Sequence, residues 1–401
     1  MYFALATPQL PPGLPNCSAM PMSRESQIKE ALIERTAALG VVGGDVIPYP
    51  TPELQLVQQL WHAKQLTSRL IRSKVAQFSI IRKPDGVHLQ STSLGSEVLY
   101  LLSILIDARL THHPCHLFDP RVELFMECAG KRSLTPAWWP TFPMTEAQML
   151  PFVDALNGFS QDVRKCGRTV SFRTKLADFQ SETDKRFKEV QNYLKQLTDL
   201  YPDGHLIRMD FCYRPYQDVG FSFGTEMHKT VSAHGAALIK HLTTSLGSAV
   251  VGYAWKRDFA AARGYQYHLV AILHGPRRQE LNNIVDSLGN HWREVITGGF
   301  GLSLNCNNSR THDFKYRGLI AMDHLSQSME EQLRQVPLYM TLTDGIVAFA
   351  PRGTAKPYGI GALPRISHEK VLQPQPAYKA YRSGEAFQPW PFRVSEQTGL
   401  S

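Results

Sequence analysis

The chain has 401 residues, of which 43% are hydrophobic, 19% are charged and 10% are aromatic, and its formal net charge is +8. This composition is that of a globular protein, and the length is enough for two structural units with a sizeable core. The basic balance favours an acidic partner, with nucleic acid ahead of an anionic membrane surface.

Neither a secretory signal nor a membrane span is predicted. The first twenty residues have no basic region ahead of an apolar run and are broken by prolines. The most apolar run, Val98 to Ile106, is too short to cross a bilayer. The six cysteines are scattered and form no C-x-x-C pair, which is typical of free thiols in a reducing compartment. We therefore expect a cytoplasmic protein without a membrane partner.

The first half of the chain has helical periodicity. We expect a disordered tail over residues 1–24 and a mainly helical region over 25–200, with helices near 53–74, 94–109 and 176–200 and an irregular connector over 110–142. In the first of these helices, apolar residues gather near one face. A second, basic face carries Lys64, Arg69, Arg72 and Lys74. We expect this basic face to hold DNA through its phosphates.

The pattern changes after a turn cluster at 201–205. Strands are predicted over 206–213, 248–258, 264–273 and 300–307. Helices are predicted over 226–246, 277–296 and 326–344, the last interrupted near Pro337. The order β-α-β-β-α-β-α predicts an α+β domain over 201–368, with an antiparallel sheet covered by helices on one side. We place a domain boundary near residue 200 and a flexible tail over 369–401.

One strand carries a candidate metal site. Gln266 and His268 lie two residues apart on the strand over 264–273, so both side chains point to the same face. Asp258 ends the preceding strand, which a short link joins to this one. Carboxylate, amide and imidazole groups are ligands suited to Mg²⁺ or Mn²⁺, with positions left for water and phosphate. A packed strand histidine and a surface carboxylate are the alternative interpretation.

Four segments of the second half resemble the inovirus gene-two protein family. They are "IRMDFCYRP", "VVGYAWKRDFAAARGYQYHLVAILHG", "LGNHWREVITGGFGLSLNCN" and "VPLYMTLTDG", and they span about residues 200–365. The family comprises phage and prophage replication proteins related to the H-U-H rolling-circle endonucleases. The resemblance implies that Asp258, Gln266 and His268 take the metal-ligand positions and that Tyr339 is the nucleophile. Tyr339 would then attack a phosphodiester of single-stranded DNA, form a 5′-phosphotyrosyl bond and release a 3′-OH that primes replication.

Two residues depart from the family's pattern. Gln266 replaces the first histidine, and Leu342 stands where the family has a lysine three residues after the tyrosine. Such a lysine would stabilise the charge that develops during attack; Arg334 or Lys356 would have to take its place. Enzymatic activity therefore stays open. The expected function is a nicking replication initiator of a phage or mobile element, and the alternative is a catalytically inactive DNA-binding regulator or accessory protein. A protein-interaction module is a third, more distant hypothesis.

A basic loop after residue 350 completes the candidate DNA contacts. Arg352 and Lys356 are suited to a DNA backbone, and Tyr358 is suited to stacking on a base. A solvated loop explains the same residues equally well. The expected partner is single-stranded or hairpin origin DNA, and a host replication protein such as a helicase stays open as a second partner.

Overall fold

The computed structural model describes residues 24–36, 38–42, 45–49, 53–84, 86–104, 116–134, 144–213, 225–260, 264–276, 278–307, 320–321, 327–350 and 356–364. The predicted tails and Arg352 lie outside these residues, apart from Arg24, which begins the first helix. None of the helices within the described ranges is both long enough and apolar enough to cross a membrane.

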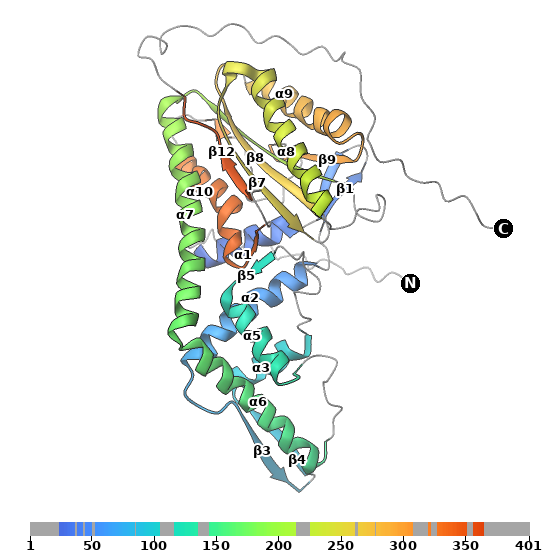
Figure 1. Cartoon of the computed structure of the whole chain (residues 1–401), viewed down its shortest axis with the longest axis vertical. Helices are drawn as coiled ribbons and strands as arrows, with labels where there is room; N and C mark the ends of the chain where they lie inside the picture. Colours follow the sequence, from blue (N-terminus) through green and yellow to red (C-terminus); the bar gives the residue numbers. More distant parts are fainter. Residues whose placement is uncertain are drawn as a thin grey trace, which may run out of the picture.

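Helices dominate the first half, as predicted (Figure 1). They are α1 (Arg24–Thr36), α2 (Glu53–Arg72), α3 (Ser93–Ile104), α5 (Pro120–Lys131), α6 (Glu146–Gly167) and α7 (Val170–Leu200). Two hairpins, β1 (Ala38–Val42) with β2 (Asp45–Tyr49) and β3 (Phe78–Lys83) with β4 (Gly86–Ser91), accompany them. The prediction that 110–142 is irregular is wrong, because β5 (His116–Phe118) and α5 lie there. Asp119 caps α5 by accepting a hydrogen bond from the Arg121 amide, and Pro120 occupies the first helical turn.

The second half is built on an antiparallel sheet. Its elements are β6 (His205–Tyr213), α8 (Thr225–Leu246), a short 3₁₀ turn (Gly247–Ala249), β7 (Val250–Ala260), β8 (Gly264–Leu273), α9 (Arg278–His291), a π-helical turn (Trp292–Ile296), β9 (Gly301–Asn305), β10 (Ile320–Ala321), α10 (Gln327–Thr341), a 3₁₀ turn (Leu342–Gly345), β11 (Val347–Phe349) and β12 (Tyr358–Ile360). The strand order is β9-β6-β8-β7-β12, with β10 on the same edge of β6 as β9. The predicted elements occur in the predicted order, with the strands β10, β11 and β12 in addition, and the α+β class is confirmed.

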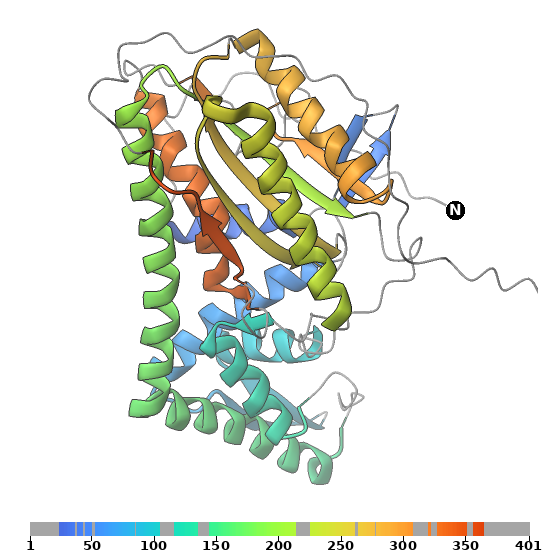
Figure 2. The same ribbon diagram turned by 45° about the horizontal axis from the view of Figure 1, so that its top comes forward.

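Helices cover both faces of the sheet (Figure 2). Leu269, Ala271 and Leu273 of β8 pack with α8 and α9, whereas Val270 and Ile272 belong to the apolar cluster that includes α7 and α10. The expectation of helices on one side is therefore wrong. The physical reason is that β8 is buried over Tyr265–Leu273, so both of its faces need a covering layer.

The core is continuous across residue 200, where we predicted a domain boundary. One apolar cluster combines α2, α5 and α6 with α7, and it extends to β6, β7 and β8 through Leu206, Ala254 and Val270. Helix α10 is not interrupted at Pro337, in contrast to the prediction, and ends at Thr341. Residues on both sides of Pro337 are buried, and this packing compensates for the amide hydrogen that proline lacks.

We expect acid to destabilise the fold through two stacked histidines. The rings of His241 on α8 and His291 on α9 lie 3.4 Å apart and nearly parallel. Burial, with the nearby His291, lowers the pKa of His241 to about 4. Between that value and an unfolded pKa near 6.5, the unfolded chain binds more protons than the folded one. The contribution of the neutral His241 ring to the free energy of unfolding is therefore complete above pH 6.5 and is lost as the pH falls toward 4. After allowance for solvent screening, this loss is about 2 kcal/mol.

Urea unfolding at pH 7.5 and pH 4.5 measures this loss, and His241→Gln is the matched variant. The variant is expected to lose less stability than the wild type between the two pH values. An equal loss in both proteins would show that the stacked pair does not contribute to acid sensitivity.

Candidate functional site

The three predicted metal ligands lie together on the sheet face that is covered by α7 and α10. On the strand ladder, Gln266 is directly opposite Asp258, and His268 is directly opposite Lys256. On the other side of β8, His268 is opposite Asp210 of β6. The side chains of all five residues are almost fully buried. The alternative of a surface carboxylate at Asp258 is therefore wrong, because this side chain is only 1% exposed.

Tyr339 from α10 reaches the same cluster. Its hydroxyl donates to Asp210 Oδ2 at 3.4 Å, and its ring lies edge-on to the His268 ring with the centroids 5.2 Å apart. Asp210 Oδ1 is 2.7 Å from His268 Nδ1, so one carboxylate joins the tyrosine to the histidine. Tyr339 has no exposed surface. The structure thus brings the proposed nucleophile beside the proposed ligands, but it encloses them.

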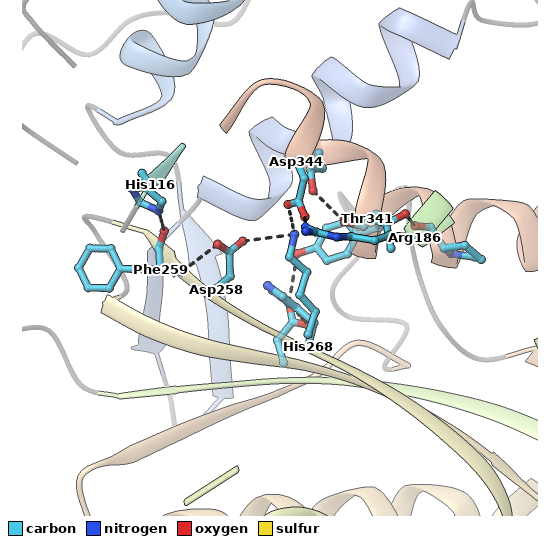
Figure 3. A network of polar contacts seen from close by, with 12 residues as sticks. His116, Arg186, Asp258, Phe259, His268, Thr341 and Asp344 are labelled. Carbon is cyan, nitrogen blue, oxygen red and sulfur yellow. Dashed lines mark hydrogen bonds and ion pairs between the residues drawn. The ribbon is translucent and has the colours of Figure 1, made fainter. Parts of the chain in front are cut away.

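Two other carboxylates, those of Asp258 and Asp344, flank the side chain of Lys256. Its ammonium group donates a hydrogen bond to Asp344 Oδ1, on the 3₁₀ turn after α10, and lies 4.0 Å from Asp258 Oδ2. Arg186 of α7 donates to the other Asp344 oxygen at 3.4 Å. Figure 3 shows Asp258 and His268 on the strand side of this network, with Asp344 and Arg186 on the helical side. Three cations therefore accompany three carboxylates: Arg186, Arg208 and Lys256 with Asp210, Asp258 and Asp344.

These donors do not fit a divalent metal ion. A metal at Asp258 and His268 would have to share the space beside Asp258 with the Lys256 ammonium, and two positive charges there would repel each other. The carboxylate nearest to His268 is already bonded to the imidazole and paired with Arg208. Within the described ranges, no three His, Cys, Asp or Glu side chains are arranged as a metal site. Lys256 supplies the positive charge that a metal would otherwise bring.

The cation beside Tyr339 is one that sequence analysis missed. The guanidinium of Arg208 lies 3.7 Å from the centre of the Tyr339 ring, as a cation–π pair. Leu342 is buried among apolar side chains. Arg334, one proposed substitute for the family's lysine, instead donates to Gln27 of α1 at 3.3 Å. A signal was present in the strand "LIRMDFCY", where Arg208 and Asp210 alternate with apolar residues on a strand otherwise suited to the core.

The predicted basic face of α2 is not a continuous surface. Lys64 is buried, and its ammonium donates to the Gly345 carbonyl at 3.1 Å and lies 3.7 Å from Asp119. Burial lowers the pKa of Lys64. The assignment of Lys64 to DNA phosphates is therefore wrong, because the side chain points into the core. Arg69 is exposed but forms two hydrogen bonds with Glu97, whereas Arg72 stays at the surface.

Two of the three candidate DNA contacts in the basic loop are described, Lys356 and Tyr358, and they differ in exposure. Lys356 is exposed, and its carbonyl accepts a hydrogen bond from Arg257 at 3.0 Å. Tyr358 donates its hydroxyl proton to Glu189 at 2.7 Å, and Arg186 lies 5.6 Å from its ring. Burial and the hydrogen bond to Glu189 raise the pKa of Tyr358 to about 12. Tyr358 therefore joins the sheet edge to α7, and Lys356 is the better candidate for a DNA contact.

Comparison with known proteins identifies no relative, since the chain matches no family model, no curated protein and no solved structure.

Proposed function

We propose that the protein binds DNA on a replication-initiator-like fold, as a regulator or accessory factor, without nicking the DNA through Tyr339. The observation that carries this proposal is the buried Lys256 ammonium between Asp258 and Asp344, at the place where the resemblance implies a metal. The resemblance to replication initiators is supported by the contact between the Tyr339 and His268 rings, because these residues lie about seventy positions apart in the chain. DNA binding is supported by the net charge of +8.

Transesterification requires a phosphate within bonding reach of the tyrosine oxygen. In this structure the Tyr339 side chain is covered, and its hydroxyl points to Asp210. A DNA phosphate would also have to enter beside Asp210 and Asp258, whose carboxylates already engage the nearby cations Arg208 and Lys256. Both features favour a binding protein over a nicking enzyme.

A nicking initiator remains the second candidate, since Arg208 lies against the Tyr339 ring. A cation at this place stabilises a developing phenolate in the way that the family's lysine is expected to do. Nicking would require α10 to move away from the sheet and release Tyr339.

One experiment separates these candidates. The protein is incubated with a mixed pool of labelled single-stranded DNA and Mn²⁺, and denaturing gels are examined for a covalent protein–DNA adduct. We expect no adduct, together with DNA retention on filters that falls steeply as salt is added. An adduct that disappears in Tyr339→Phe would establish nicking. Retention that does not depend on salt, or no retention, would favour the protein-interaction module.

A further inference from the structure

A groove on the opposite face of the sheet from Tyr339 has the features of an anion site. It lies between α8, β7 and the segment before β12 and has a volume of about 530 Å³, within the range of ligand sites. Among the described residues that line it, Lys240, Arg257 and Lys356 are cationic and none is acidic. Within the described residues, none of these three side chains forms an ion pair with a carboxylate.

Arg257 is the fixed element of this groove. Its side chain is 2% exposed, and it is held by hydrogen bonds to the Ser232 hydroxyl and to the Lys356 carbonyl. Its Nε is buried and has no hydrogen-bond partner among the described residues. A buried guanidinium without a carboxylate is costly, and a bound anion would offset this cost. Arg257 is thus oriented in advance for a phosphate, which accepts two parallel hydrogen bonds from a guanidinium.

Aromatic rings complete the groove. Trp255 and Tyr267 line it with ring centroids 5.9 Å apart. The Tyr267 hydroxyl donates to the Val231 carbonyl of α8 at 2.8 Å, a close approach that Gly235 permits. A Cβ atom at residue 235 would lie 2.4 Å from this hydroxyl. The Tyr267 ring is therefore fixed against α8, and Trp255, which is partly exposed, offers a flat surface for a nucleobase.

We infer that this groove binds a nucleotide unit of single-stranded DNA, with a phosphate at Arg257 and the base against Trp255. Cations that contact the backbone and aromatic rings that stack on bases are the combination by which proteins hold single strands. A duplex keeps its bases paired and stacked, so it cannot place a base on Trp255. The inference rests on the proposed DNA binding and adds the site and the form of the DNA.

The test is the anisotropy of a labelled oligo(dT) measured over a range of salt concentrations. Lys240→Ala combined with Lys356→Ala is the test variant, since both side chains are exposed. Lys185→Ala combined with Lys195→Ala removes the same charge from the exposed side of α7 and is the matched control. The test variant is expected to bind at least about tenfold more weakly, with a salt slope lower by about 1.4, because each phosphate contact on a single strand contributes about 0.7. Trp255→Leu is expected to weaken binding about fivefold or more through lost stacking.

The outcomes separate the two proposals. If the wild type binds oligo(dT) and the test variant weakens no more than the control, the groove inference is wrong while DNA binding stands. If the wild type binds duplex DNA but not oligo(dT), the groove inference is wrong while DNA binding stands, and if it binds neither, both are wrong. A thermal-shift titration with thymidine monophosphate then tells whether the groove takes a free nucleotide, since the shift would be lost in the test variant. Duplex binding equal to single-strand binding would also overturn the inference.

Discussion

Replacement of Lys256 by methionine is expected to lower the free energy of unfolding by about 3–5 kcal/mol, because removing one partner of a buried ion pair leaves charges without compensation. Lys256 is 2% exposed and is the cation between Asp258 and Asp344. Without it, Asp344 keeps the longer contact to Arg186, but the buried Asp258 and Asp344 carboxylates lose the cation that lies between them. Methionine fills a similar volume, so most of the loss arises from charge. Urea unfolding monitored by circular dichroism measures it.

Lys188→Met is the control, because Lys188 is exposed on α7, and its effect is expected to stay within about 0.5 kcal/mol. A thermal melt of the wild type tests separately whether Lys256 stands in for a metal. Millimolar Mn²⁺ is expected to leave the melting temperature of the wild type unchanged, since a ligand stabilises only a protein that binds it. A wild type that gains several degrees in Mn²⁺ and loses them in EDTA would show that the Asp258 and His268 side chains hold a metal after all.

The elements of the sheet domain are predictable from the sequence because its strands and helices have strong local signals. The alternation in β6 and β8 and the amphipathic pattern of α8 and α9 locate these elements to within a few residues. The same patterns do not predict which helices pack on each face of the sheet. A strand that is buried on both faces has a nearly continuous apolar sequence, and only the fold shows that α7 and α10 supply the second layer.

The candidate site was predicted in part. Gln266, His268, Asp258 and Tyr339 were selected from the sequence, and they do share one buried face. The charged residues that decide its chemistry were not predicted, because they meet only through cross-strand register and helix packing. Lys256 was assigned no role, although it is next but one to Asp258 on the same strand, and residues two apart on a strand lie on the same face. Asp344 lies almost ninety positions from Lys256, and no sequence spacing links them.

Asp210 is the second residue whose loss we expect to be severe. Its carboxylate accepts hydrogen bonds from Tyr339 and Arg208 and is 2.7 Å from the His268 ring nitrogen, at 1% exposure. Asp210→Leu removes the carboxylate that pairs with the buried Arg208 and is expected to cost about 3–5 kcal/mol in unfolding free energy. Asp210→Asn keeps the shape and should cost less, since the amide oxygen still accepts one hydrogen bond.

A double substitution separates charge from packing at this position. Arg208→Met combined with Asp210→Leu removes both charges, and it is expected to recover most of the stability lost in Asp210→Leu, because apolar residues of similar volume often replace a buried ion pair without loss. The interaction energy follows from the two single variants and the double variant. If the double variant is as unstable as the sum of the singles, Asp210 acts through His268 and Tyr339 rather than through Arg208. DNA binding should persist in every variant that folds, because the groove at Arg257 lies on the other face of the sheet.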